Sequence, residues 1–220
     1  MVAESYRGRV GPYVERLSTP FLGWSPNSLS TLALGLAVGA GLLSLLVRWT
    51  NPLLFLPVAL LIFTSGVFDV LDGAVARRTG RSSVRGDFLD HVFDRYADVA
   101  IVAGLAASGF AYVPLGLFAL VSLLLTSYMG TQAQAVGQGR LYAGLLGRAD
   151  RLLILAAAAF LEFDLSLPWP WAPSAPLSHI HVLGLSFTVL DLAFAYFVIA
   201  GQWTAASRAW RVYRALPPAG

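Results

Sequence analysis

The chain has 220 residues, of which 57% are hydrophobic and only 12% are charged, and its mean hydropathy is +0.68. A soluble domain carries about 25% charged residues, so this composition excludes an ordinary soluble protein. The formal net charge is +3, and cysteine is absent, which excludes disulfides and thiol chemistry. We therefore expect an integral membrane protein that works among membrane lipids and has no nucleic-acid partner.

Residues 5–20 form the first predicted element, a short helix on the inner membrane surface. Val10, Tyr13, Val14 and Leu17 recur at helical spacing, with arginines and Glu15 between them. An apolar stripe beside basic residues is typical of an amphipathic helix at a membrane interface. The alternative for this segment is a frayed arm.

Six segments follow that are long and apolar enough for membrane-spanning helices, since a span needs about 20 mostly apolar residues. They cover approximately residues 28–47, 53–76, 87–109, 112–136, 151–167 and 181–205. Glu162 and Asp164, near the end of the fifth segment, are expected at the outer interface. The predicted fold class is an all-α integral membrane protein with six transmembrane helices and an N-terminal interfacial helix, in a single domain covering residues 1–220.

The arginines predict the orientation of these spans. They cluster before the first segment, between the second and third, between the fourth and fifth, and after the sixth, whereas the connections on the other side hold only Arg48. Basic residues favour the cytoplasmic side of a cell membrane. Both termini are therefore expected in the cytoplasm, together with the charged ends of the second and third segments.

Four aspartates stand at those charged ends: Asp69, Asp72, Asp90 and Asp94. The first two are three positions apart and the last two are four apart, so each pair shares one face of a helix. Ionisable residues inside membrane helices are costly and default to a functional role. Four carboxylates close together need cations, and oxygen donors of this kind suit Mg²⁺ or Mn²⁺. We expect two divalent ions here.

The full pattern around these aspartates resembles the signature of the CDP-alcohol phosphotransferase family, also called CDP-alcohol phosphatidyltransferases. It reads D69-x2-D72-G73-x2-A76-R77-x8-G86-x3-D90-x3-D94 and agrees with the family at every fixed position. The resemblance implies an enzyme that moves a phosphatidyl-type group from CDP-diacylglycerol or CDP-archaeol to an alcohol, releases CMP, and works as a homodimer.

The resemblance also implies roles for single residues. Asp69, Asp72 and Asp90 would be the main metal ligands, and Asp94 would complete the second metal site and act as the general base. The CDP group would be bound by a set of motif residues: Asp72, Gly73, Ala76, Arg77, Ser83 and Gly86. The arginines between the second and third segments, Arg78, Arg81 and Arg85, are open to two interpretations: they could hold a substrate phosphate or contact anionic lipid headgroups.

The acceptor pocket is expected near the start of the fifth segment. Arg148 and Arg151 match two arginines of the branch that makes inositol-phosphate lipids, so they would bind a phosphorylated acceptor such as inositol 1-phosphate. Gly130, Gln132 and Gln134 stand where that branch often has Lys, Arg and Glu. Glycerol 3-phosphate or another polar alcohol, including a neutral polyol, therefore stays open as the acceptor.

Two other functional classes use acidic residues inside membranes. An intramembrane prenyltransferase normally needs two separate Asp-rich motifs and more spans, whereas the carboxylates here form one continuous set. A cation-coupled transporter predicts broken helices and an inverted repeat, and the sequence has neither. Both are therefore less favoured alternatives to the phosphotransferase.

Overall fold

A computed structural model describes residues 11–139, 144–145, 147–167, 180–182 and 185–216. Their long helices are α2 (Pro26–Val47), α3 (Phe55–Arg78), α4 (Val84–Ala106), α5 (Val113–Ala135), α6 (Arg148–Leu165) and α7 (Val189–Ala215). Two 3-10 turns, η1 (Thr19–Phe21) and η2 (Pro52–Leu54), precede α2 and α3. The predicted helices are therefore present, with ends that differ by a few residues from the expected ones for five of the six.

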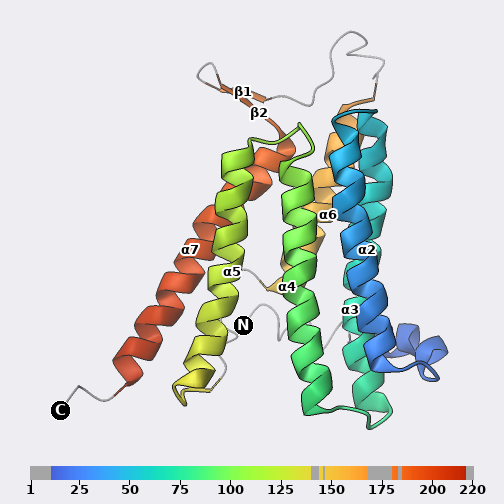
Figure 1. Ribbon diagram of the computed structural model, residues 1–220, viewed down its shortest axis with the longest axis vertical. Coiled ribbons are helices and arrows are strands. Elements are labelled where there is room, and N and C mark those ends of the chain that lie inside the picture. The colour runs from blue at the N-terminus through green and yellow to red at the C-terminus, as the bar shows by residue number, and fades with distance from the viewer. Residues whose placement is uncertain (1–10, 140–143, 146, 168–179, 183–184, 217–220) are drawn as a thin grey trace.

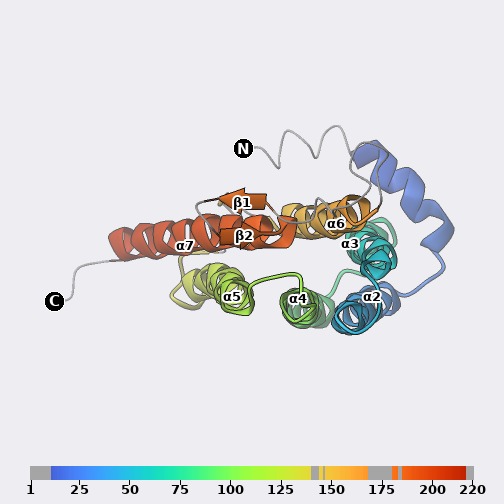
Figure 2. The ribbon, with the colours of Figure 1, turned by 90° about the horizontal axis from the view of Figure 1, so that it is seen from above.

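The six long helices form a two-layered bundle, with α7, α6 and α3 in one layer and α5, α4 and α2 in the other (Figures 1 and 2). Each helix packs against two neighbours, so that the order α2, α3, α6, α7, α5, α4 closes on itself. The chain alternates in direction along the bundle (Figure 1). Consequently, one end of the bundle, which we call the motif end, holds the start of α2, the connection from α3 to α4, the end of α5, the start of α6 and the end of α7.

The last expected span was placed wrongly at its start. Ile180–Val182 (β1) and Leu185–Phe187 (β2) form an antiparallel hairpin, and α7 begins only at Val189. Thr188 accepts a hydrogen bond from the Asp191 backbone N–H, and the Asp191 side chain accepts one in return, which is a capping box. Apolar content alone predicted residues 181–188 as helix, and this polar cap was the signal that marks the true start.

Four helices of the described part are long and apolar enough to cross a membrane. They are α2, α3 together with η2, α5 and α7. The other two, α4 and α6, hold the acidic and basic residues of interest and fall short in apolar character. They lie in the middle of their layers, each between two of the four helices that are apolar enough to cross a membrane (Figure 2).

Small residues bring α4 close to α2. A Cβ added to Gly104 of α4 would collide with the backbone of Gly41 in α2, and one added to Gly41 would collide with the backbone of Ala100. Only glycine permits backbones to approach this closely, and such contacts are typical of helices packed within membranes. The contact holds the apolar half of α4, and so it sets the position of the acidic half.

Residues 11–18 form a helix whose axis lies across the bundle axis at the motif end (Figures 1 and 2). This is the described part of the predicted interfacial helix, whose first residues, 5–10, lie outside the described ranges. Tyr13 and Leu17 are exposed, as expected for a lipid-facing side. Arg78 donates from Nη1 to the Glu15 carbonyl at 2.5 Å and to the Ser18 hydroxyl at 2.7 Å. Arg78 therefore attaches this helix to the end of α3.

Candidate active site and metal centre

The four motif aspartates meet at the motif end, where α3 ends and α4 begins. Carboxylate oxygens of Asp69, Asp72 and Asp90 lie within 4.8 Å of one another, and so do ligand atoms of Asp90, His91 and Asp94. Asp90 belongs to both groups and lies between them. The structure therefore confirms the prediction that the two pairs of carboxylates lie close together.

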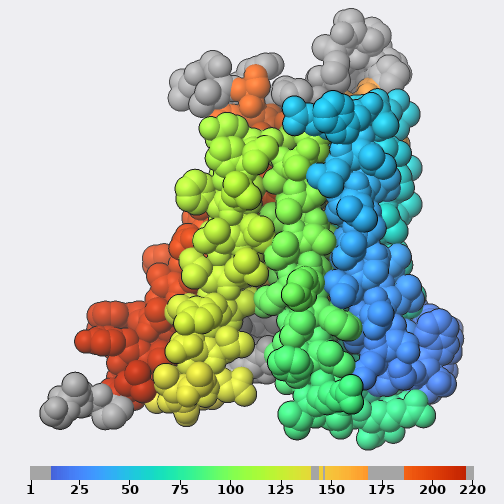
Figure 3. Space-filling model, in the orientation of Figure 1, coloured from blue at the N-terminus to red at the C-terminus, as the bar shows by residue number. Residues whose placement is uncertain are grey.

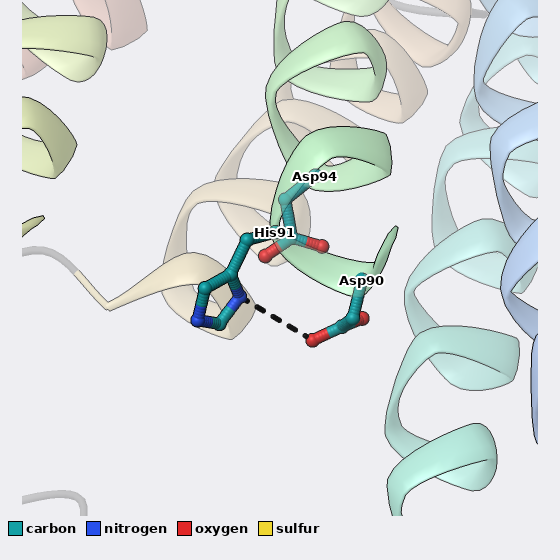
Figure 4. A group of neighbouring side chains, drawn as sticks. All are labelled: Asp90, His91 and Asp94. Atoms are coloured by element: carbon teal, nitrogen blue, oxygen red, sulfur yellow. Dashed lines mark ion pairs between the residues drawn. The ribbon is translucent and has the colours of Figure 1, made fainter. Parts of the chain in front are cut away.

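The donor set of these two groups fits divalent ions. The first group offers three carboxylates, which are the hard oxygen donors that Mg²⁺ and Mn²⁺ accept. The second group adds the His91 imidazole, and a nitrogen ligand suits Mn²⁺ better than Mg²⁺. His91 Nδ1 lies 3.7 Å from Asp90 Oδ2 and projects from the same half of α4 as Asp90 and Asp94 (Figure 4). From its position in the sequence His91 was interpreted as a structural residue beside the cluster, whereas the structure brings its ring within ligand distance of Asp90 and Asp94.

Helix capping explains the local geometry at the start of α4. The Ser83 hydroxyl accepts a hydrogen bond from the Gly86 N–H at 3.0 Å, and Asp87 stands in the first turn, where the helix dipole favours a negative charge. A Cβ on Gly86 would lie 3.2 Å from Ser83 Oγ and 3.6 Å from Asn27 Oδ1 of α2. Ser83 and Gly86, both expected to bind CDP, thus also shape the turn that presents α4.

The other residues expected to bind CDP lie on the last two turns of α3. The Arg77 side chain folds back over Gly73, since a Cβ on Gly73 would lie 3.1 Å from Arg77 Nη1. Arg77 is exposed and Ala76 is half-buried, so this face is open to a ligand at the motif end. Asp72 is only 5% exposed and accepts a hydrogen bond from Ser30 of α2.

Arg148 connects the carboxylates to α6. Its Nη1 contacts Asp69 Oδ1 and lies 2.7 Å from Asp94 Oδ1, so one guanidinium bridges a carboxylate of α3 and a carboxylate of α4. The side chains of Asp94 and Arg148 are 13% and 14% exposed. Arg148 is therefore at the acidic cluster itself, closer to the proposed metal ligands than an acceptor-binding role alone requires.

Arg151 lies one turn deeper along α6 and has a different partner. Its Nη1 donates to Asp98 Oδ2 at 2.8 Å, and both side chains are buried. Arg95 of α4 lies 3.5 Å from the same Asp98 oxygen and 3.6 Å from Asp94 Oδ2. A network of two arginines and two aspartates therefore continues from the cluster into the bundle between α4 and α6.

A cavity of about 510 Å³ opens beside this network, between α4, α5, α6 and α7. Its polar lining includes Asp94, Arg148 and Arg151, together with Ser127, Tyr128, Thr131 and Arg208. The surface is hollowed between the lower halves of α4 and α5 (Figure 3). The Nε atoms of Arg148 and Arg151 are buried and have no hydrogen-bond partner among the described residues. Buried donors of this kind favour a ligand that supplies acceptors.

Arg208, which the sequence predicts to belong to an interfacial anchor, also lines this cavity. It is 7% exposed on α7, and its Nη1 donates to the Thr126 carbonyl of α5 at 2.5 Å. In the sequence it belongs to a run with Arg211 and Arg214, which is typical of a basic segment at a membrane surface. Only the packing of α7 against α5 distinguishes Arg208, because it turns this arginine toward the cavity.

Comparison with known proteins identifies relatives of this chain. A family model described as CDP-alcohol phosphatidyltransferase matches residues 24–206. The chain is 39% identical over 133 residues to an archaetidylinositol phosphate synthase of Methanothermobacter thermautotrophicus, covering 60% of this chain and 66% of the relative, just under two thirds. It is 32% identical over 159 residues to an archaetidylinositol phosphate synthase of Pyrococcus horikoshii, covering 71% of this chain and 81% of that relative.

The fold resembles a solved enzyme over most of its length. A crystal structure of Mycobacterium tuberculosis phosphatidylinositol phosphate synthase with CDP-DAG bound matches with a TM-score of 0.67 at 25% identity, covering 90% of this chain and 94% of that chain. A structure of the same mycobacterial enzyme in complex with manganese and citrate has a TM-score of 0.69 at 24% identity, covering 91% and 88%. The helix arrangement described above is thus shared with a membrane enzyme.

Proposed function

The chain belongs to the CDP-alcohol phosphatidyltransferase family, and from this premise we propose that it transfers a phosphatidyl-type group from a CDP-lipid to a phosphorylated polar alcohol and releases CMP. Inositol 1-phosphate is the proposed acceptor. The observation that carries the proposal is the cavity of about 510 Å³ in which Asp94, the proposed base, lies beside four arginines. Family membership displaces the prenyltransferase and transporter alternatives.

The proposed donor is CDP-diacylglycerol or CDP-archaeol. The exposed end of α3 would hold the CDP group through Asp72, Gly73, Ala76 and Arg77, and the start of α4 through Ser83 and Gly86. A guanidinium such as that of Arg77 binds phosphate oxygens in a two-pronged geometry. The mycobacterial structure with bound CDP-DAG supports a CDP-lipid donor for this fold.

Asp69, Asp72, Asp90 and Asp94 are proposed to hold two divalent ions, Mg²⁺ or Mn²⁺. The ligand atoms fall into two groups that share Asp90, which is the arrangement expected for a pair of ions. When bound, such ions would neutralise the pyrophosphate of the donor and stabilise the negative charge on the leaving CMP.

The chain's own residues then account for acceptor activation. Asp94 faces both the acidic cluster and the cavity, so its carboxylate would take the proton of the acceptor hydroxyl. The hydroxyl oxygen forms a bond to the β-phosphorus, the bond from this phosphorus to the CMP oxygen breaks, and CMP leaves. The new product is the phosphodiester lipid, and the proton remains on Asp94 until solvent takes it.

The arginines of the cavity support a phosphorylated acceptor. Arg148 and Arg151 each have a buried Nε without a hydrogen-bond partner among the described residues, and Arg208 lines the same space. Gly130 and Thr131 also line it, which leaves room at the position where the inositol-phosphate branch often has a lysine. The names of the two archaeal relatives support inositol 1-phosphate over glycerol 3-phosphate.

An acceptor screen tests the proposal. Purified protein in lipid vesicles is given radiolabelled CDP-diacylglycerol or CDP-archaeol, Mg²⁺ or Mn²⁺, and one of inositol 1-phosphate, glycerol 3-phosphate, serine or inositol, and CMP release is measured. We expect metal-dependent release with inositol 1-phosphate far above the others. Release with glycerol 3-phosphate instead would move the assignment to that acceptor, and a preference for neutral inositol would contradict a phosphate site among the arginines.

We propose further that all six long helices cross the membrane within a single domain covering residues 1–220, that the motif end faces the cytoplasm, and that the enzyme is a homodimer. The described arginines of the connections and termini gather at the motif end, apart from Arg48, which supports this orientation. Accessibility of single cysteines introduced next to Arg81 and Arg48 to an impermeant reagent in sealed vesicles would test it.

A further inference from the structure

Ser30 is the one side chain outside the acidic motif that the structure brings onto Asp72 within the described residues. It lies on α2, 42 positions earlier in the sequence, and its hydroxyl donates to Asp72 Oδ2. Ser30 is 8% exposed and Asp72 is 5% exposed, which makes Asp72 more deeply buried than the other three motif aspartates. A contact between two such buried groups is well shielded from water.

The hydroxyl has a single proton and two acceptors within reach. Ser30 Oγ also lies 3.2 Å from the Pro26 carbonyl, one turn earlier in α2. A hydrogen bond to an ionised carboxylate is roughly twice as strong as one to a neutral carbonyl. The proton is therefore directed to Asp72, and the helix backbone holds the serine in place without competing for it.

This contact fixes the orientation of the Asp72 carboxylate. The oxygen that accepts the Ser30 proton is held against α2, and the same carboxylate offers a ligand atom within 4.8 Å of ligand atoms of Asp69 and Asp90. Outer hydrogen bonds of this kind orient metal ligands, and their loss typically costs 10–100-fold in metal affinity. We propose that Ser30 is a positioning residue that orients Asp72 for divalent-ion binding, an inference that rests on the proposed function.

The chain offers a matched control for this contact. Ser65 of α3 is fully buried at the interface between α2 and α3, and its hydroxyl donates across that interface to the Ala33 carbonyl at 2.8 Å. Ser65→Ala removes a buried interhelical hydroxyl of the same size without touching a carboxylate. Ser30→Thr keeps a hydroxyl at position 30.

The experiment measures Mn²⁺ binding to the full chain in detergent by electron paramagnetic resonance of the free ion. We expect Ser30→Ala to raise the Mn²⁺ dissociation constant about 10–100-fold, with wild-type affinity in Ser65→Ala and affinity largely restored in Ser30→Thr. In the CMP-release assay, Ser30→Ala should need more Mn²⁺ for half-maximal rate while its rate at saturating Mn²⁺ stays near wild type.

Two results would overturn the proposal: unchanged Mn²⁺ affinity in Ser30→Ala, or an equal loss in Ser65→Ala, which would indicate a general packing defect. Asp72→Asn separates this inference from the function on which it rests. If Asp72→Asn loses Mn²⁺ and Ser30→Ala does not, only the role of Ser30 fails. If Asp72→Asn binds Mn²⁺ as wild type does, the metal assignment of Asp72 in the proposed function fails with it.

Discussion

At the end of the bundle opposite the acidic motif, Glu162 and Asp191 are as deeply buried as Asp72 is at the motif end, with exposed fractions of 0%, 4% and 5%. The groups that donate hydrogen bonds to these carboxylates differ between the two ends of the bundle. Glu162 Oε1 accepts from the Leu190 N–H at 3.0 Å, and Asp191 Oδ1 accepts from the Tyr112 N–H at 2.7 Å. These backbone donors stand at the starts of α7 and α5, where helices leave N–H groups without intrahelical partners.

The motif end satisfies its carboxylates through side chains. Asp69 and Asp94 contact the Arg148 guanidinium, Asp94 also lies near Arg95, Asp90 lies near His91, and Asp72 accepts a hydrogen bond from the Ser30 hydroxyl. A backbone donor in a helix start cannot turn away, whereas an arginine side chain can move to a phosphate and leave its carboxylate to a cation. The comparison teaches that burial alone does not distinguish the motif aspartates in this chain; what differs is that Asp69 and Asp94 pair with an arginine side chain, whereas Glu162 and Asp191 accept from backbone N–H groups at helix starts.

The largest expected effect comes from removing the proposed base. Asp94→Asn should lower turnover at least 10²–10⁴-fold, because general-base catalysis contributes about that much, while CDP-lipid binding stays nearly intact. CMP release and binding of a radiolabelled CDP-lipid measure the two quantities. Asp191→Asn is the matched change at the other end, and its activity per folded molecule should equal wild type. Loss of nucleotide binding in Asp94→Asn without a rate defect would contradict the assignment.

The arginines allow a finer test of the motif end. Arg148→Ala should lower kcat and raise KM for the phosphorylated acceptor, since Arg148 contacts Asp69 and Asp94 as well as the cavity. Arg208→Ala should raise the acceptor KM about 10–100-fold with a smaller change in kcat, because a hydrogen bond to a charged group is worth about 1.5–3 kcal/mol. KM for the CDP-lipid is the control in both variants. An equal rise in both KM values would argue against an acceptor-phosphate role.

Much of the fold and the centre of the site followed from sequence patterns of short range. The length and apolar content of the segments predicted six helices, and the helical spacing of Asp69 with Asp72 and of Asp90 with Asp94 predicted a shared carboxylate cluster, because both patterns can be recognised within a single segment. The contacts of Ser30 and Arg208 depend on which helices become neighbours, which no local pattern contains. The β1–β2 hairpin escaped notice because strands and helices of similar apolar content are not separated by hydropathy.

Glu162, at the opposite end of the bundle, likewise has a contact that no local sequence pattern predicts. A carboxylate near the end of a predicted span was expected at the outer interface; Glu162 lies at the end of the bundle opposite the motif, but its side chain is fully buried and caps α7. The sequence signal for a cap is normally local, whereas here the capping acid lies on α6, 28 positions before Leu190. Interhelical caps of this kind are visible only once the helices are packed.

Removing this interhelical cap should affect stability without affecting chemistry. Glu162→Ala is expected to destabilise the protein by about 1–3 kcal/mol, since the Leu190 N–H would be left buried without an acceptor. Thermal unfolding in detergent measures the loss, and Glu162→Gln, which keeps an acceptor oxygen, should lose less. Activity per folded molecule at low temperature should match wild type in both. A strong activity defect at unchanged stability would show that this end of the bundle takes part in function.

The smallest expected effect concerns two adjacent arginines at the end of α3. Arg78 donates to Glu15 and Ser18 and so holds residues 11–18, whereas the side chain of Arg77 lies over Gly73, where CDP is proposed to bind. Arg78→Ala should speed amide exchange in residues 11–21 about tenfold, because the net contribution of such contacts is about 1–1.5 kcal/mol, and should leave KM for the CDP-lipid near wild type.

Arg77→Ala is the matched neighbour and should behave in the opposite way, with a raised KM for the CDP-lipid and normal exchange in residues 11–21. Hydrogen exchange followed by mass spectrometry and the CMP-release assay give both readouts on the same preparations. Since the two side chains differ by one position on one helix, a shared helix distortion would change both readouts in both variants. That outcome would mean that Arg77 and Arg78 act together and have no separate roles. The difference between the two ends of the bundle would then belong to the whole end of α3 and not to single arginines.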